Sequence, residues 1–523
     1  MHKLFALGAT LLSVALLASG CGTSQPEDTA HTLHILAGSE LKDIVPLLSD
    51  FEKSSGLTVK LTYTGSLDGA QAIVEGDKSD LAWFSSGNYL TLLEGKSGRI
   101  VAQHPIMLSP VVLGVKHSVA QSLGWSGSTG VTWADIAAAA RAGKFHFAMT
   151  NPAASNSGFV ALVGVASAFA PGGNLDAGNV NVDKLKDFFS GQTMTAGSSG
   201  FLADAFTRQQ GRVDGIINYE SVLLELNSGG KLKEPLDLIY PKDGIITADY
   251  PLMLLNPAKR DAYEKLVAYL RTTDVQTKIM TTTDRRPSIP DVKPDSRFSS
   301  QLLVELPFPA NLNVVNNLIF AYLDQIRPPA HTYYVLDISG SMEGDRLDAV
   351  KKTFDNLTGA DQSITGQFAR LRAREEITII PFNGSVQDDR TFTINDVTSN
   401  SPDLKAVRNY VDNLQANDGT GIYDALEQAY NDAAAAQASD PNRFYSVVLM
   451  TDGENNSGAG PSDFQNFYKN QTAVVQQIPT FPIIFGEASP QDLTNIATLT
   501  GGQAFDSRNA SLATIFKVIR GYQ

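Results

Sequence analysis

The sequence contains a single cysteine, Cys21, among its 523 residues. One cysteine cannot form an intramolecular disulfide or a CxxC metal or redox site. The seven histidines form no HExxH pattern, and Gly95-Lys96-Ser97 is not a phosphate loop because the leading glycine is replaced by Leu90. These absences leave no pattern that supports catalytic chemistry. We therefore expect that the protein is not an enzyme and has no catalytic residue.

Basic residues are also scarce. The chain has 41 Lys and Arg against 55 Asp and Glu, a formal net charge of −14 and a pI of about 5.0. Nucleic-acid-binding domains carry basic patches, so this balance argues against a nucleic-acid partner. From residue 331 onward, 24 Asp and Glu against 14 Lys and Arg leave the segment at −10. Such a surface suits cations or basic protein patches, or serves solubility alone.

An apolar run of notable length occurs at the N-terminus, over Leu4–Leu17, and is followed by Ala18-Ser19-Gly20-Cys21. The run is shorter than the roughly 20 residues that span a bilayer, and with the small residues it predicts a secretory signal over 1–20. The ending on cysteine resembles a bacterial lipoprotein signal, although Ala18 stands where that family usually has leucine. The resemblance implies lipidation of Cys21, a polar tether over 21–30 and anchoring in the cell membrane, facing the periplasm or the cell exterior. The alternative is an ordinary secretory signal with an incidental cysteine.

Two α/β patterns follow, separated by a connector. Strand-like and helix-like segments alternate from residue 31 to about 300, beginning with a strand over Thr32–Ala37, a helix over Leu41–Lys53 and a strand over Leu57–Thr64. Residues 301–330 predict a helical connector that contains the apolar run Val314–Ile326. A second α/β pattern covers 331–523.

Three separate segments of this second pattern place side-chain oxygens beside predicted strands or helices. The predicted strand Tyr333–Leu336 leads into Asp-Ile-Ser-Gly-Ser, a Gly-flanked threonine precedes a helix over Tyr423–Ala429, and the strand Phe444–Met450 leads into Thr-Asp-Gly. Ligand sites of open α/β sheets lie at the carboxyl ends of strands, and hydroxyl and carboxylate oxygens suit a hard cation such as Mg²⁺. The predicted metal residues are Asp337, Ser339, Ser341, Thr420 and Asp452.

The order and spacing of these motifs resemble a von Willebrand factor A (VWA) domain with a metal-ion-dependent adhesion site (MIDAS). Segments Ile377–Phe382 and Ile483–Phe485 agree as further core strands. The resemblance implies that the two serines and the threonine contact Mg²⁺ or Mn²⁺ directly, and that the two aspartates act largely through waters. It further implies a protein partner whose Glu or Asp fills the open metal position, so that the ion is adhesive and not catalytic. We expect this site to be exposed at the edge of the sheet.

Residues 31–300 resemble a two-lobed extracellular solute-binding protein of the molybdate-type, or type 2 periplasmic-binding, kind. The resemblance rests on short sequence motifs that occur in the order typical of that family, among them Ala37-Gly38-Ser39, Thr64-Gly65-Ser66, Asn156-Ser157-Gly158 and Gly215–Glu220. Hydroxyls and amides at helix N-termini can bind an oxyanion through aligned dipoles. The predicted ligand-binding residues are Ser39, Ser66, Ser157 and Tyr219. Three alternatives stay open: the serines are ordinary N-caps, the ligand is a small peptide or sugar, or the pocket is vestigial.

The expected architecture is therefore α/β throughout, with a two-lobed binding-protein-like domain followed by a Rossmann-like, doubly wound VWA domain. The function we expect is that of a surface-anchored lipoprotein which binds a small solute in its first domain and a protein partner through a Mg²⁺-dependent site in its second. One alternative is the substrate-binding component of an ABC-type transport system with an accessory VWA docking domain. Another is a VWA-type metal-insertion or assembly factor.

Overall fold

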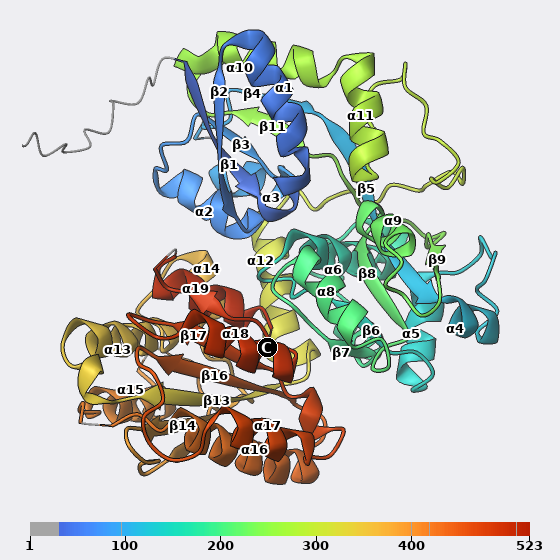
Figure 1. Cartoon of the computed structure of the whole chain (residues 1–523). Helices are drawn as coiled ribbons and strands as arrows, with labels where there is room; N and C mark the ends of the chain where they lie inside the picture. The colour runs from blue at the N-terminus through green and yellow to red at the C-terminus, as the bar shows by residue number, and fades with distance from the viewer. Residues whose placement is uncertain (1–30, 96, 399, 418, 509, 523) are drawn as a thin grey trace, which may run out of the picture.

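The computed structural model describes residues 31–522 apart from 96, 399, 418 and 509, and shows α/β architecture throughout (Figure 1). The predicted signal, tether and Cys21 lie outside the described residues. Within the described ranges, no helix is both long and apolar enough to cross a membrane.

Lobe 1 of the first domain is built on a sheet with the strand order β2-β1-β3-β11-β4. Its strands are β1 (Thr32–Gly38), β2 (Thr58–Thr64), β3 (Leu81–Trp83), β4 (Ala102–Pro105) and β11 (Pro251–Leu254). Its helices are η1 (Ser39–Ile44), α1 (Val45–Ser55), α2 (Ser66–Glu75), α3 (Asn88–Glu94), η3 (Pro257–Lys259), α10 (Arg260–Leu270) and α11 (Thr273–Thr283). The range Leu41–Lys53 is helical as predicted, but it is divided between two helices instead of forming one. A 3₁₀ turn comes first, and α1 starts only at Val45, with Pro46 in its first turn, where the missing amide hydrogen costs least.

Lobe 2 is built on a sheet with the order β10-β5-β8-β6-β7, in which β9 and β12 also pair with β5. Its strands are β5 (Met107–Lys116), β6 (Phe147–Met149), β7 (Gln192–Met194), β8 (Gly215–Tyr219), β9 (Leu236–Ile239), β10 (Thr247–Ala248) and β12 (Arg286–Pro287). Its helices are α4 (His117–Ser122), α5 (Trp133–Arg141), α6 (Asn156–Phe169), η2 (Pro171–Gly173), α7 (Val182–Phe189), α8 (Ser199–Arg208) and α9 (Glu220–Ser228). The chain crosses between the lobes from β4 to β5, from β10 to β11 and from α11 to β12, and the second crossing contains Asp249 and Tyr250.

The connector is helical over α12 (Leu312–Ala321), which continues as the π-helical turn η4 (Tyr322–Ile326). The helix predicted over Val314–Ile326 therefore exists and begins two residues earlier. Val315, Leu318 and Ile319 are buried in the same hydrophobic core as both lobes. The connector is thus part of the first domain's packing and holds the start of the second domain close to it (Figure 1).

The second domain has a mostly parallel sheet in the order β15-β14-β13-β16-β17-β18, and β15 is antiparallel. Its strands are β13 (Ala330–Asp337), β14 (Glu376–Phe382), β15 (Arg390–Thr393), β16 (Phe444–Thr451), β17 (Thr480–Ile484) and β18 (Phe505–Asp506). One face is covered by α13 (Asp345–Leu357), α15 (Pro402–Asp412) and α19 (Leu512–Arg520), with α14 (Ile364–Ala369) beside them. The other face is covered by α16 (Ile422–Ser439), α17 (Pro461–Lys469) and α18 (Pro490–Thr500). The short turns are η5 (Gly340–Met342) and η6 (Val475–Gln477).

Candidate functional site

The loop after the central strand β13 begins with Asp337, which is fully buried. One carboxylate oxygen accepts a hydrogen bond from the Ser339 amide at 2.7 Å, and the other accepts one from the Thr451 hydroxyl at 2.6 Å. The carboxylate is therefore held between the ends of the neighbouring strands β13 and β16. The expectation that this site is exposed is wrong for Asp337, Ser339, Thr420 and Asp452, which are buried. Ser341 at the tip of the loop is exposed.

Ser339, Ser341 and Asp452 form a continuous polar chain across this edge. The hydroxyls of Ser339 and Ser341 lie 3.1 Å apart, and the Ser341 hydroxyl donates to Asp452 Oδ1 at 2.7 Å. Thr420 completes the cluster. A Cβ built on Gly453 would lie 3.6 Å from Thr420 Oγ1 and 3.8 Å from Ser341 Oγ, so both hydroxyls border the same small space. The structure thus brings all the predicted metal residues to one edge of the sheet.

Two asparagines that the sequence reading missed hold the threonine loop in place. The Thr420 amide donates to Asn456 Oδ1 at 2.8 Å, and the Asn456 amide donates back to the Thr420 carbonyl at 2.9 Å. The Ile422 amide donates to Asn455 Oδ1 at 2.8 Å. Their signal was the pair of asparagines that follows Thr451-Asp452-Gly453-Glu454, because Asn side chains readily satisfy backbone groups of nearby loops.

Burial and a neighbouring charge shift the pKa of one carboxylate in this cluster, that of Asp337. Burial raises the pKa of Asp337, the nearby Asp452 raises it further, and the hydrogen bonds from Ser339 and Thr451 oppose the shift. Asp452 also forms an ion pair with Arg346, a residue that the sequence reading missed. The Arg346 guanidinium packs against Gly486, where a Cβ would lie only 2.7 Å from its Cζ. A cationic group of the protein therefore already balances one of the two carboxylates.

The donor set fits a hard cation. Three hydroxyls and two carboxylates converge without any sulfur or nitrogen ligand, and oxygen-only sites suit Mg²⁺, Ca²⁺ or Mn²⁺. Within the part of the chain that the structure describes, no group of three or more His, Cys, Asp or Glu side chains is arranged so that it could hold a metal ion. A cation at this edge would therefore depend on hydroxyl ligands and would keep most of its positive charge.

In the first domain, Tyr219 links the two lobes. Its hydroxyl donates to Ser85 Oγ of lobe 1 at 2.9 Å and accepts from Asn156 Nδ2 of lobe 2 at 3.0 Å. The Ser157 hydroxyl is buried and lies 2.8 Å from both the Thr150 and the Ser199 hydroxyls. Its hydrogen bonds are thus made within lobe 2.

Of the other two predicted serines, Ser39 lies at the mouth of the cleft between the lobes and Ser66 is buried. Ser39 is exposed and borders a cavity of about 210 Å³ there, and Ser66 is the first residue of α2. The alternative that the three serines are N-caps is wrong. The cap positions of η1, α2 and α6 belong to Gly38, Gly65 and Ser155.

Glu40, which the sequence analysis did not predict as a site residue, has its carboxyl group inside the cleft. Burial raises its pKa, while its own backbone amide, Arg285 and a hydrogen bond from Ser85 oppose that shift. Its carboxylate lies over Gly38, 2.8 Å from where a Cβ would be. Because this is the first turn after β1, the carboxylate lies where an oxyanion was expected.

The second domain covers the mouth of this cleft. The cavity there is bordered by Asp68 of lobe 1, by Ala154 and Gly197 of lobe 2, and by residues of α14 and α19, including Thr365, Phe368 and Lys517. The Asn151 amide of lobe 2 donates to the Arg520 carbonyl at 3.4 Å. Gly197 and Gly521 meet so closely that a Cβ on Gly521 would lie 2.7 Å from Gly197 Cα. The second domain therefore contacts both lobes at once.

Comparison with known proteins gives a family for each domain. Residues 33–281 match the model of the bacterial extracellular solute-binding proteins, and residues 333–518 match that of the von Willebrand factor type A domain. Human inter-alpha-trypsin inhibitor heavy chain H2 is 27% identical over 139 residues, which are 25% of this chain but only 13% of that protein.

Solved structures resemble the first domain at low identity. The periplasmic binding protein AfuA from Actinobacillus pleuropneumoniae, with fructose-6-phosphate bound, is 14% identical with a TM-score of 0.44, over 56% of this chain and 98% of that one. The sulfate-binding protein SubI from Mycobacterium tuberculosis is 20% identical with a TM-score of 0.41, over 54% of this chain and 93% of that one. From the two family matches, the chain joins a bacterial extracellular solute-binding domain to a C-terminal von Willebrand factor A domain.

Proposed function

We propose that this protein is a solute-responsive adhesion protein at the bacterial cell surface. Its VWA domain binds a protein partner through Mg²⁺ or Mn²⁺, and its solute-binding domain changes how the VWA domain is held. The observation that carries the proposal is the contact of α14 and α19 with both lobes at the mouth of the cleft. If a solute changes the angle between the lobes, this contact has to change as well.

The metal-binding residues would be the hydroxyls of Ser339, Ser341 and Thr420, oriented by Asp337 and Asp452. The ion would supply an electrophilic position for an acidic side chain of the partner. Asp337 serves to fix the loop, because both of its oxygens already accept hydrogen bonds from residues of the site. The site lies at the carboxyl ends of β13 and β16, whereas the connector enters at the amino end of β13, so the first domain leaves this edge free.

The geometry favours sensing over delivery. A transport receptor has to release its solute through the mouth of the cleft, and here α14 and α19 cover that mouth. Glu40 also bears on the kind of solute, because its carboxylate would repel an oxyanion at the same turn. We therefore propose a neutral or cationic solute. In a thermal-shift screen, amino acids, sugars or polyamines should raise the melting temperature, and a rise with sulfate or molybdate instead would contradict this choice.

The metal proposal is tested by titrating Mg²⁺ into the chain that lacks residues 1–20, followed by calorimetry. Asp337→Asn and Thr420→Val should each abolish measurable binding, because each removes a group of the converging cluster. Thr393→Val, at an exposed threonine of β15, is the matched control and should bind Mg²⁺ like the wild type. A surface-protein pull-down should then lose its partner in chelator. Equal Mg²⁺ binding by Thr420→Val and wild type would refute the hydroxyl-based site.

A further inference from the structure

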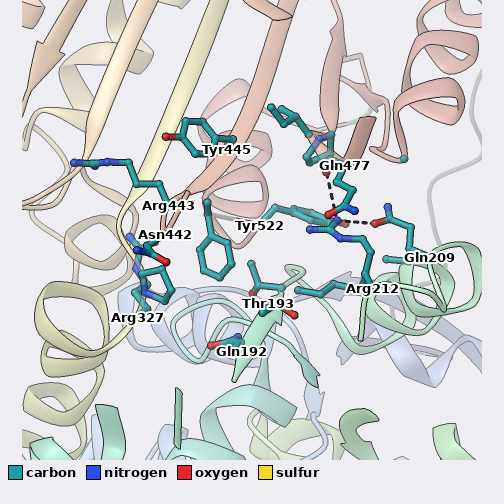
Figure 2. A pocket seen from close by; sticks show the side chains of 18 of the residues that line it. Gln192, Thr193, Gln209, Arg212, Arg327, Asn442, Arg443, Tyr445, Gln477 and Tyr522 are labelled. Carbon is teal, nitrogen blue, oxygen red and sulfur yellow. Dashed lines mark hydrogen bonds between the residues drawn. The ribbon is translucent and has the colours of Figure 1, made fainter. Parts of the chain in front are cut away.

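A cavity of about 730 Å³ lies between lobe 2 and the VWA domain, away from both sites described above. It is bordered by β7 and α8 of lobe 2, by the connector at Arg327, and by the amino ends of the VWA strands. Figure 2 shows Arg327 and Arg443 on one side of this space, Arg212 on the other, and Thr193 between them. The metal cluster lies at the opposite, carboxyl edge of the same sheet.

The lining is strongly cationic in a protein whose net charge is −14. Among the described residues that line it, Asp204 is the one acid, and the basic residues are Lys186, Arg208, Arg212, Arg327, Arg374 and Arg443. Arg443 is balanced from outside the lining by Asp440 at 2.8 Å and Glu376 at 3.2 Å. Arg327 forms an ion pair with Glu375, and Glu375 also forms an ion pair with Arg520 at 2.8 Å.

The other four basic residues lack such partners. Within the described part of the chain, no carboxylate lies within ion-pair distance of Lys186, Arg208, Arg212 or Arg374. Arg212 instead donates to Gln209 Oε1 at 2.6 Å and to the Gln477 carbonyl of the VWA domain at 3.3 Å. Burial lowers the pKa of Arg212, as expected for a guanidinium whose charge is not balanced nearby.

Several buried polar atoms of the lining have no hydrogen-bond partner. Arg327 is only 2% exposed, yet its Nε and Nη1 are unpartnered among the described residues. The hydroxyls of Thr193 and Thr195, at the edge strand β7, are likewise buried and unpartnered. Buried polar groups are nearly always hydrogen-bonded in native proteins, so unpartnered groups on one cavity indicate a missing acceptor.

The size and the apolar part of the lining indicate what kind of acceptor this is. Phe189, Tyr445, Phe481 and Tyr522 add ring surfaces to the cavity. Its volume falls in the range of about 300–1,000 Å³ that is typical of small-molecule sites, far larger than a simple inorganic ion needs. Guanidinium groups beside aromatic rings suit a flat organic body that carries a negative group.

We propose that this cavity binds a small organic anion, with a phosphate, sulfonate or carboxylate group on a ring-containing body. Arg212 on one side of the cavity and Arg327 and Arg374 on the other attract the negative group, Thr193 between them donates a hydrogen bond to it, and the ring lies against the aromatic wall. Because these residues come from lobe 2, the connector and the VWA domain, the bound anion ties the two domains together. This site is separate from the solute cleft and does not depend on the metal proposal.

The probe for the test is 8-anilinonaphthalene-1-sulfonate, an aromatic sulfonate whose fluorescence rises on binding. The full chain lacking residues 1–20 should bind it saturably at one site. The double variant R212Q/R374Q should weaken binding at least tenfold. The control R141Q/R260Q removes the same charge from exposed arginines outside the cavity and should stay within twofold of the wild type. Circular dichroism checks that all variants are folded.

A second variant separates a ligand-binding role from a structural one. Thr193→Val replaces an unpartnered hydroxyl by a methyl group of similar shape, so it should raise the melting temperature of the free protein while weakening the probe severalfold. Hydrogen exchange of β7 and of residues 442–445 should slow when the probe binds. The proposal is overturned if the wild type binds no probe saturably, if R212Q/R374Q and R141Q/R260Q weaken it equally, or if Thr193→Val binds the probe unchanged.

Discussion

The carboxylate of Asp452 has two partners with opposite effects on a cation. Ser341 orients one oxygen within the metal cluster, and Arg346 places a positive group on the other. Two like charges so close together repel each other even where solvent screens them. We therefore expect Arg346 to stabilise the metal-free domain and to compete with a metal ion for Asp452.

Replacing this arginine should consequently strengthen metal binding. We predict that Arg346→Gln lowers the Mg²⁺ dissociation constant about tenfold, which corresponds to about 1.4 kcal/mol. The control is Arg508→Gln, which removes an arginine that is half exposed and pairs with Asp506 in the same domain. Calorimetry measures both variants. Weaker Mg²⁺ binding by Arg346→Gln would mean that the guanidinium orients Asp452 for the metal and does not compete with it.

That the predicted metal residues meet at one sheet edge could be predicted from the sequence, but the groups around them could not. Asp337, Thr420 and Asp452 follow strands or precede helices whose ends meet at one sheet edge, and this follows from the sequence pattern. Arg346 is 106 residues from Asp452 in the chain, and Asn456 is 36 residues from Thr420. The asparagines are visible as a pair in the sequence, but which residues such side chains contact depends on tertiary distances that no local pattern encodes. The burial of Asp337 was missed for the same reason.

At the scale of elements, the buried parallel strands were the easiest to predict. β13, β14 and β16 are buried over nearly their whole length because helices cover both faces of their sheet, and their positions agree with the sequence prediction to within three residues. Phe485 was placed in β17, which ends at Ile484. The arrangement of α14 and α19 over the solute cleft has no sequence signal, since it depends on how two separately folded patterns pack together.

The crossing between β10 and β11 is a strained element with a titratable group. Tyr250 has a positive φ of 42°, which a bulky residue rarely adopts. Burial raises the pKa of the adjacent Asp249 from 3.8 to about 6, and Glu305 adds to the shift. Between pH 3.8 and about pH 6, Asp249 is protonated more often in the folded state than in the unfolded state. Stability from this group is therefore present below pH 3.8 and is lost as the pH rises through 6.

Replacing Asp249 by a neutral residue should remove this loss of stability at high pH. We predict that Asp249→Asn raises the free energy of unfolding by up to about 3 kcal/mol at pH 8 and changes it little at pH 3. Urea unfolding at both pH values measures the difference. Asp291→Asn, at an exposed position, controls for the change in net charge. A gain that is equal at pH 3 and pH 8 would show that the titration of Asp249 is not its cause.

At the scale of the whole molecule, the close approach of Gly197 and α19 holds the two domains together. A Cβ on Gly197 would lie 2.9 Å from the Val518 carbonyl oxygen, a backbone atom that cannot move alone. We predict that Gly197→Ala weakens the contact between the domains by about 1–3 kcal/mol. Faster hydrogen exchange in α19 and a larger radius of gyration in solution scattering would report this.

The matched control for that variant is Gly200→Ala. A Cβ at Gly200 meets nothing within 4 Å, and the residue lies in the first turn of α8. It should therefore leave both the exchange and the radius of gyration unchanged. If both variants behave like the wild type, the contact at the cleft mouth contributes little to holding the domains together, and the proposed coupling loses its support.

Cys21 decides where the molecule resides, if the lipoprotein resemblance is correct. Two or more acyl chains would anchor the protein stably, because each buried methylene contributes about 0.8 kcal/mol. We predict that Cys21→Ser moves the mature protein from the membrane fraction to the soluble or secreted fraction. Cell fractionation with immunoblotting measures this. Identical fractionation of variant and wild type would contradict the lipid anchor.

The position of β13 has a mechanical consequence. The metal cluster begins at its last residue, Asp337, and the connector enters at its first, Ala330. If the proposed partner binds at this edge, a pull on that partner loads β13 along its own axis. β13 is hydrogen-bonded on one side to β14 and on the other to β16 along nearly its full length. Axial tension then shears both ladders simultaneously instead of peeling them one bond at a time, and the domain should withstand forces such as those of fluid flow over a cell.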